Sequence, residues 1–230
     1  MASPQKGYGI IMEMNSARIE ELVKQVVAEM SGASAPAATG DEIPVGISNR
    51  HVHLTREHVE ILFGKGYTLE KLKDLSQPGQ YACKEVVTII GPSLRPIERV
   101  RVLGPERRAS QVEISRTDSF ALKVKATVRE SGNIDGTAGV TIVGPCGVVK
   151  LEEGCIIANR HIHMAPADAA RFGVSDGDTV TVDALGERRT RFYDVQVRVS
   201  DAFCLEMHVD TDDANAVGMT AKSTVRIVKD

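Results

Sequence analysis

Tryptophan is absent from the chain, and aromatic residues make up only 4% of it. Proteins that bind single-stranded nucleic acids usually stack bases on aromatic side chains, so this composition argues against such a platform. The formal net charge of −3 also gives no basic surplus of the kind that attracts a phosphate backbone. We therefore expect no nucleic-acid partner.

Long apolar runs are missing as well. No stretch approaches the ~20 residues that a membrane-spanning helix needs. The first residues do not show the basic start, apolar centre and small-residue cleavage site of a signal peptide. We expect no membrane association and predict a cytoplasmic protein.

The four cysteines form no CxxC pair and lie far apart, at Cys83, Cys146, Cys155 and Cys204. We interpret them as buried, reduced thiols of a cytosolic protein. A catalytic thiol is the alternative, although no cysteine lies in a recognisable nucleophile motif.

The most informative feature that is present is a doubled motif, Asn-Arg-His-x-His, at Asn49–His53 and Asn159–His163. These copies contain four of the six histidines. Residues i and i+2 of a strand lie on the same face, so each copy can direct two imidazoles toward one metal ion. The repeat predicts two related halves with a metal site between them.

The flanks of the two motifs also match. Thr55 can cap a helix over Arg56–Phe63, and Pro166 can begin a helix that ends at Phe172. Both helices are followed by Phe-Gly, where glycine suits a left-handed C-cap. Matching flanks favour an internal duplication over a chance recurrence.

Short β-branched or alternating runs bounded by Gly and Pro follow both motifs and favour small barrels. The sequence predicts a mainly β fold: two small β-barrel domains from an internal duplication, capped by short helices, with an N-terminal amphipathic helix. The expected strands are Val45–Ile47, Glu85–Ile90, Val100–Leu103, Gln111–Ile114, Ala121–Val128, Cys155–Ala158, Thr179–Val182, Phe192–Val199, Cys204–Val209 and Ser223–Val228.

An amphipathic helix is predicted over residues 16–30, followed by a small-residue linker over residues 31–40. Such a helix could dock on its own domain. It could also bind another protein by lying in a groove of that protein.

The candidate metal ligands are five histidines and one carboxylate: His51, His53, His161, His163, His208 and Glu113. Six ligands exceed the needs of one tetrahedral zinc ion, so two metals bridged by Glu113 fit better. Imidazoles bonded to the backbone, or a closed structural zinc site, are the alternatives. Glu206 could serve as a partner of His208, and we interpret His58 as an ordinary histidine on a helix.

A Gly-Pro turn at Gly104-Pro105 places Arg107 near the strand that carries Glu113. Arginine beside a metal suits a bidentate grip on phosphate or carboxylate. A solvated turn is the alternative interpretation.

Three segments together, NRHVHL at Asn49, GPERRASQVEIS at Gly104 and NRHIHM at Asn159, resemble the phosphate propanoyltransferase family, the phosphotransacylases of bacterial microcompartments. The resemblance implies interconversion of short-chain acyl-CoA (propanoyl- or acetyl-CoA) plus phosphate with acyl phosphate plus CoA. It also implies a two-zinc site between two barrels.

Carried over by residue, the resemblance has His51 and His53 hold one zinc ion, whose open position takes the CoA sulfur. His161, His163 and His208 hold the other, Glu113 bridges, and Arg107 binds phosphate. Arg107 and Glu113 are thus the expected catalytic residues.

The resemblance also implies a domain organisation. Residues 1–40 would recruit the enzyme into a bacterial microcompartment through shell proteins or cargo. Apart from the resemblance, exposed apolar residues of the predicted helix could drive assembly, and we expect a homo-oligomer. Because the family exchanges its opening strand, residues 41–50 plus 159–230 would form the C-terminal barrel and residues 51–158 the central barrel.

Two rival functions use the same residues. A di-zinc hydrolase of phosphoesters or amides would activate water instead of binding CoA. A metal-bound scaffold or shell-interaction protein would have no catalytic activity, so His161→Ala would not reduce turnover. Phosphate-dependent release of thiol from propanoyl-CoA separates the transferase from both, and we favour direct attack by phosphate over an acyl-enzyme.

Overall fold

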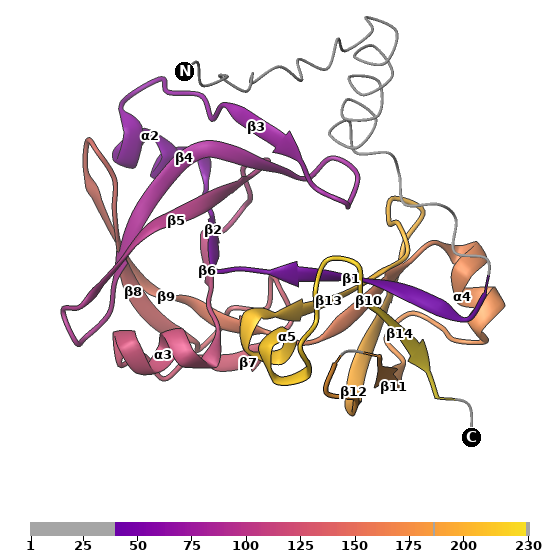
Figure 1. The fold of residues 1–230 in the computed structure, drawn as a ribbon. Coiled ribbons are helices and arrows are strands. Elements are labelled where there is room, and N and C mark those ends of the chain that lie inside the picture. Colours follow the sequence, from indigo (N-terminus) through magenta and orange to yellow (C-terminus); the bar gives the residue numbers. More distant parts are fainter. Residues whose placement is uncertain (1–39, 186, 229–230) are drawn as a thin grey trace, which may run out of the picture. The chain divides into compact units, whose positions relative to one another are not determined.

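The computed structural model describes residues 40–185 and 187–228, which form a mainly β structure with short helices (Figure 1). The predicted fold class, two small barrels with helical caps, is confirmed for these residues. The helix predicted over residues 16–30 lies outside the described part of the chain.

The C-terminal barrel is a closed ring of six strands in the order β1-β13-β10-β12-β11-β14. Its strands are β1 (Glu42–Ser48), β10 (His161–Met164), β11 (Thr179–Ala184), β12 (Thr190–Val199), β13 (Glu206–Asp210) and β14 (Thr224–Ile227).

The central barrel is a second ring of six strands, β4-β5-β2-β6-β9-β8, which β8 closes by pairing with both β4 and β9. Two further strands, β3 and β7, pair with β4 and β9 outside the ring. The strands are β2 (His51–His53), β3 (Lys71–Asp74), β4 (Tyr81–Ile90), β5 (Pro96–Gly104), β6 (Gln111–Glu113), β7 (Thr127–Arg129), β8 (Ala138–Val143) and β9 (Val148–Ala158).

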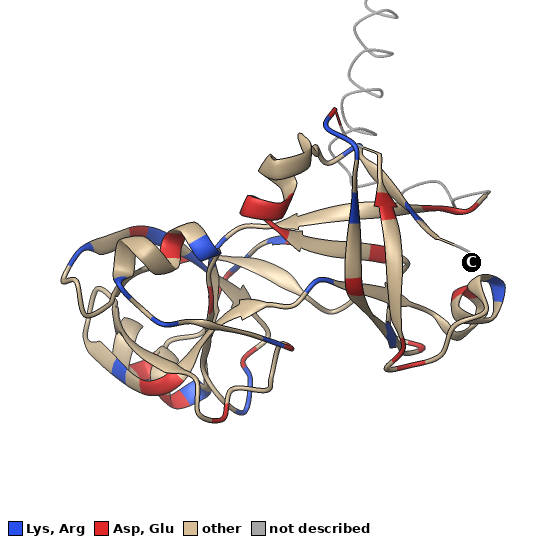
Figure 2. Ribbon diagram, turned by 90° about the horizontal axis from the view of Figure 1, so that it is seen from below, with Lys and Arg blue, Asp and Glu red and all other residues tan. Residues whose placement is uncertain are grey.

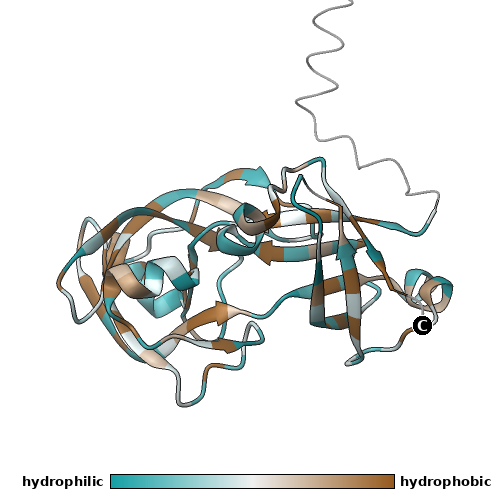
Figure 3. Cartoon of the chain, turned by 60° about the horizontal axis from the view of Figure 1, so that its bottom comes forward, coloured by the Kyte–Doolittle hydropathy of each residue, from teal (hydrophilic) through white to brown (hydrophobic). Residues whose placement is uncertain are grey.

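Each barrel has its own apolar core, because alternate side chains of a barrel strand point inward. Brown segments recur along the strands of both barrels in Figure 3. Val52, between the first two histidines, is fully buried in the central core, and Ile162, between the second two, is fully buried in the C-terminal core. Burial of the middle residue directs the flanking histidines to the other face of the strand.

The two barrels exchange strands just before each histidine motif. β1 belongs to the C-terminal barrel, where it pairs with β13 and β14, although the next strand, β2, belongs to the central barrel. The end of β9 pairs with β6 and β7 of the central barrel, although the next strand, β10, belongs to the C-terminal barrel. The chain therefore crosses between barrels twice, each time at an Asn-Arg pair.

The helices α2 (Arg56–Phe63) and α4 (Pro166–Phe172) lie where the sequence predicts them. Thr55 caps α2 by accepting a hydrogen bond from the His58 amide, and Pro166 stands in the first turn of α4. Gly173 adopts the predicted left-handed conformation at the end of α4. The same prediction is wrong for Gly64, which has φ 114° and ψ 152°.

The strand predicted over Ala121–Val128 is wrong, because this stretch contains the end of helix α3 (Arg116–Leu122) and the start of β7. Ser115 and Asp118 form a capping box that begins α3. Lys123 then adopts the left-handed conformation and ends the helix. The apolar alternation after Ala121 reflects burial of Leu122, Val124 and Ala126 rather than one continuous strand. The remaining helix is α5 (Thr211–Val217).

Acidic and basic side chains are interspersed along the described chain (Figure 2). None of the helices in the described residues is long and apolar enough to cross a membrane. All four cysteines are free: Cys83 and Cys155 are buried as predicted, but Cys146 and Cys204 are exposed, so the prediction of buried thiols is wrong for that pair.

Candidate metal centre between the barrels

The two His-x-His strands occupy equivalent places in the two barrels. In the central barrel, His51 lies opposite Glu113 of the antiparallel strand β6. In the C-terminal barrel, His161 lies opposite His208 of the antiparallel strand β13. Glu113 and His208 therefore occupy corresponding register positions in the two barrels.

The central cluster consists of His51, His53 and Glu113. The Nε2 atom of His51 lies 3.4 Å from Oε2 of Glu113, and Nε2 of His53 lies 3.9 Å from Oε1. One potential ligand atom from each of the three residues lies within 4.8 Å of the others. Two imidazoles and a carboxylate therefore point to one small region.

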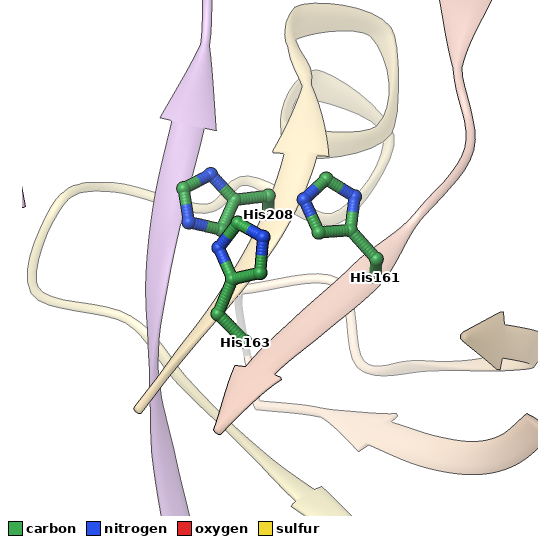
Figure 4. Close-up of side chains that lie close together, drawn as sticks. All are labelled: His161, His163 and His208. Carbon is green, nitrogen blue, oxygen red and sulfur yellow. The ribbon is translucent and has the colours of Figure 1, made fainter. Parts of the chain in front are cut away.

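The C-terminal cluster consists of His161, His163 and His208, whose rings lie side by side (Figure 4). The ring centroids of His161 and His208 are 5.0 Å apart and nearly parallel. His163 meets both edge-on, at 4.6 Å from His161 and 4.8 Å from His208. This cluster has three imidazoles and no carboxylate among its potential ligands.

Backbone carbonyls orient the first histidine of each motif. Nδ1 of His51 donates to the Asn49 carbonyl at 2.8 Å, and Nδ1 of His161 donates to the Asn159 carbonyl at 2.8 Å. Because a carbonyl only accepts, Nδ1 carries a hydrogen, and in the neutral imidazole Nε2 keeps its lone pair. Each motif thus presents a nitrogen that can bind a metal.

The arginine of each motif fixes the crossing point. Arg50 makes two bonds of 2.8 Å to Asp118 at the start of α3. Arg160 donates to Asp213 at the start of α5 at 3.0 Å. Asp118 and Asp213 therefore play the same part at the two crossing points.

The electrostatic states of the two clusters differ. Burial and the charge of His208 lower the pKa of His161 to about 4, and burial with His161 lowers the pKa of His163 to about 2. Burial also acts to lower the pKa of His51, but Glu113 outweighs it and raises that pKa. Burial acts to raise the pKa of Glu113, but His51 and His53 lower it far below its usual range. His161 and His163 are therefore neutral near pH 7, as metal binding requires.

Both clusters line one cavity of about 480 Å³. The central barrel contributes its cluster, Arg107, Ser131 and the loop before β4, and the C-terminal barrel contributes its own cluster, Arg198 and Phe203. This volume is typical of a small-molecule site. The exchange of strands between the barrels therefore creates one cavity that is lined by candidate metal-binding side chains from both halves.

Two arginines face this cavity from opposite barrels. Arg107 donates to Ser131 Oγ at 3.0 Å, and that hydroxyl donates to Glu113 at 2.8 Å. Burial lowers the pKa of Arg107, and Arg198 acts in the same direction. The side chain of Arg198 has no hydrogen bond or ion pair within the described residues, and its guanidinium carbon lies 6.0 Å from the centroid of the Phe203 ring. A cation without a counter-ion makes the cavity suited to an anion.

The donor sets fit zinc. Three imidazoles, whose potential ligand nitrogens lie within 4.8 Å of one another, leave a fourth tetrahedral position for a substrate. The Nδ1 atom of His163 is buried and has no hydrogen-bond partner within the described residues. The central set combines two imidazoles with a carboxylate, which is also a common catalytic set.

The structure thus brings together all six predicted ligands and Arg107 around one cavity. His58 lies apart from the cavity lining and bonds to Ser110, consistent with an ordinary helix residue. Sequence reasoning missed Arg198, Ser131 and Gln77. Arg198 lies opposite His163 on β12, so strand register could have identified it only if the pairing of β10 with β12 were known.

Comparison with known proteins identifies the class. The family model described as phosphate propanoyltransferase matches residues 44–220. A phosphate propanoyltransferase of Lachnoclostridium phytofermentans is 54% identical over 90% of this chain and 97% of its own length. Those of Thermotoga maritima and Clostridioides difficile are 56% and 48% identical, over 81% and 92% of this chain and 89% and 99% of theirs.

The fold, the site and these relatives define an enzyme of the acyltransferase class, built from two six-stranded barrels. The chain belongs to the phosphate propanoyltransferase family. The family resemblance noted in the sequence is confirmed.

Proposed function

We propose that this chain transfers a short-chain acyl group between CoA and phosphate, acting on propanoyl-CoA or acetyl-CoA at a two-zinc site between the barrels. One observation carries the proposal: two metal-ligand clusters and two arginines line the same cavity. A thioester and an inorganic anion need such a combination of sites.

His51 and His53 would hold one zinc ion, and His161, His163 and His208 the other, with Glu113 bridging. When bound there, zinc supplies Lewis-acid stabilisation of the thiolate and of oxygen charge. The remaining work falls to the side chains of the chain itself.

Arg107 would bind phosphate. Its backbone amide donates to the Leu54 carbonyl at 2.9 Å, and its guanidinium donates to Ser131, so both ends of the residue are held. A fixed guanidinium can align phosphate oxygens with the acyl carbon, which lowers the entropic cost of the reaction. Arg198 is the second cation available to that anion.

In this reaction a phosphate oxygen attacks the thioester carbon, an O–C bond forms, and the C–S bond breaks. The CoA thiolate leaves with the bonding electrons. We favour direct attack, because no cysteine of the described residues lines the cavity, and burial raises the pKa of both Cys83 and Cys155 to about 12. Covalent acylation of the protein by acyl-CoA alone would contradict direct attack.

The decisive experiment mixes zinc-loaded protein with propanoyl-CoA, with and without phosphate, and measures both free thiol and acyl phosphate. We expect thiol release only with phosphate, in equal amount to acyl phosphate. Thiol release without phosphate would support a di-zinc hydrolase instead. Absence of turnover in both arms would support a non-enzymatic scaffold.

We also propose an internal duplication, with residues 41–50 plus 159–230 as the C-terminal barrel and residues 51–158 as the central barrel. The equivalent pairing of His51 with Glu113 and of His161 with His208 supports this division. Residues 1–40 would bind a microcompartment shell protein or cargo, and the enzyme would act as a homo-oligomer within the microcompartment.

Deletion of residues 1–40 tests this targeting role. We expect full acyltransferase turnover and loss of co-purification with microcompartment shells. Light scattering on both forms reports the oligomeric state. A truncated protein that fails to fold would show instead that the deleted residues belong to the core.

A further inference from the structure

The loop between β3 and β4, residues 75–80, connects the two barrels across the cavity. It begins and ends on strands of the central barrel, yet its side chains reach β13 and the residues before it in the C-terminal barrel. The backbone bonds from Leu75 to Gln80 and from Gln80 to Gln77 make it compact. Most of the loop lines the cavity.

Gln77 attaches this loop to the C-terminal barrel. Its Oε1 accepts from the Cys204 amide at 3.1 Å, and its Nε2 donates to the Cys204 carbonyl at 3.1 Å. A primary amide can make both bonds to one residue, as a neighbouring strand would. Gln77 is only 6% exposed, although both of its chain neighbours, Ser76 and Pro78, are exposed.

Glu206 connects the same loop to the C-terminal cluster. Its Oε2 atom accepts a hydrogen bond from Ser76 Oγ, lies 3.4 Å from Nε2 of Gln77, and lies 2.9 Å from Nε2 of His208. One carboxylate oxygen therefore contacts the loop and the histidine together. Movement of the loop away from β13 would remove the partners that hold this carboxylate beside His208.

Gly46 makes room for the carboxylate. It lies on β1 directly beside His208 in register. A Cβ atom at this position would come within 2.9 Å of Cδ of Glu206 and within 3.1 Å of both carboxylate oxygens. Since real Cβ contacts are not this short, any larger residue would displace Glu206.

We propose that residues 75–80 are a lid over the cavity, that Gln77 latches it to Cys204, and that Glu206 is a positioning residue that couples the closed lid to His208. The proposal rests on the proposed function, because a closed lid keeps water from competing with phosphate for the acyl group. CoA must enter and leave, so the lid has to open in each turnover.

Amide hydrogen exchange of the zinc-loaded full chain tests the latch directly, with free CoA as the probe. Gln77→Met keeps the size of the side chain but removes both bonds to Cys204. We expect exchange of the peptide covering residues 75–80 to rise about tenfold, as two lost hydrogen bonds predict. Gln80→Met is the matched control: it lies in the same loop, and its side chain makes no bond within the described residues, so its exchange should match the parent chain.

A second readout follows the chemistry. Gln77→Met should raise the share of propanoyl-CoA lost to hydrolysis, with thiol release exceeding acyl phosphate, while zinc content stays unchanged. Gly46→Ala should raise exchange of residues 75–80 less than Gln77→Met does, because it displaces Glu206 but leaves both bonds between Gln77 and Cys204 in place. Glu206→Gln should weaken lid closure less, because an amide oxygen still accepts from Ser76.

Exchange of residues 75–80 in Gln77→Met that equals the parent chain, with and without CoA, would overturn the latch. Failure of the proposed function gives a different pattern: no acyl phosphate from the parent chain, while the exchange difference between Gln77→Met and Gln80→Met persists. The exchange measurement therefore decides the lid independently of turnover.

Discussion

The two barrels hold the same strand arrangement but differ at two register positions. Opposite the first histidine of each motif stands Glu113 in the central barrel and His208 in the C-terminal barrel. Opposite the second histidine stands Gln111 in the central barrel and Glu206 in the C-terminal barrel. The carboxylate therefore stands opposite the first histidine in the central barrel and opposite the second histidine in the C-terminal barrel.

This displacement of one carboxylate changes the charge of the clusters. Glu113 favours a protonated His51, whereas the C-terminal imidazoles repel protons from one another. The central cluster thus supplies a carboxylate among its own potential ligands, whereas the C-terminal cluster supplies imidazoles only.

Gln111 and Glu206, which stand opposite the second histidine of each motif, also differ in what they contact. Gln111 donates to Glu113 and Ser131 and accepts from the Gly132 amide, all within the central barrel. Glu206 accepts from Ser76 of the other barrel. Each therefore links a cluster to a loop at the cavity, but only the C-terminal one links it to the opposite barrel.

Removal of a ligand should have the largest effect and should separate the two clusters. His208→Ala should lose one zinc ion, because it serves one cluster, whereas Glu113→Ala should lose both, because a bridging carboxylate serves both. Turnover should fall by more than about 100-fold in each, since even indirect ligand partners cost up to that much. Elemental analysis and thiol release measure these losses, with His58→Ala as the control; equal zinc loss in both variants would argue against bridging.

Removal of the cavity cations should have the next largest effect. Arg107→Ala should raise the KM for phosphate by about tenfold or more, as loss of charged hydrogen bonds predicts. Arg198→Ala should raise it less, because its guanidinium is not held by a hydrogen bond. Zinc content should stay near that of the parent chain. The exposed Arg95 provides an alanine control, and an unchanged KM in Arg107→Ala would remove it from the phosphate site.

The pH dependence of stability should have opposite sign for His161 of the C-terminal barrel and for His51 of the central barrel. In the unfolded chain a histidine takes up its proton below about pH 6.5. In the folded chain His161 takes up its proton only below its lowered pKa of about 4. The unfolding free energy of the metal-free protein should therefore fall as the pH falls from 6.5 to 4, by up to about 1.4 kcal/mol per pH unit for each such histidine. His51, whose pKa is raised, adds stability below pH 6.5 that is lost as the pH rises through its folded pKa.

Urea denaturation with chelator present, from about pH 4 to about pH 8, measures both slopes. His161→Gln should flatten the loss on the acidic side, and His51→Gln should flatten the loss on the alkaline side. Parallel curves for His161→Gln and the parent chain would contradict the assignment of the acidic slope to this cluster.

The smallest difference should appear at the crossing points. Asp118 accepts two bonds from Arg50 and is 6% exposed at its side chain, whereas Asp213 is 21% exposed. Asp118→Asn should lower the unfolding free energy by about 1–3 kcal/mol, and Asp213→Asn by about 1 kcal/mol or less. Urea denaturation at neutral pH measures both. Equal losses would mean that the second bond of the Arg50 pair contributes nothing.

Much of the local structure could be predicted from sequence because its causes are local. Thr55 caps α2 through a hydrogen bond to a residue three positions on, and Pro166 begins α4. The strand predicted after Ala121 is wrong because apolar alternation begins within α3, a helix that starts at the capping box of Ser115. That box is visible in the sequence, and its Ser-x-x-Asp spacing could have prevented the error.

The candidate metal ligands could be predicted from sequence because the alternation along single strands directs their side chains to one face. Gln77 and Arg198 were missed because neither belongs to the repeat: Gln77 gains its role from Cys204, which lies far along the chain, and Arg198 gains its role from pairing with β10. Local patterns carry no information about such partners.

From its residues alone the sequence specified two strands that each present paired histidines, since alternation along a strand is a property of neighbouring residues. Their convergence on one cavity came from tertiary structure. It depends on β1 and β9 pairing in the opposite barrel from the strand that follows each of them. Such pairings join residues far apart in the chain, and they form because each barrel must close its ring to satisfy its backbone hydrogen bonds.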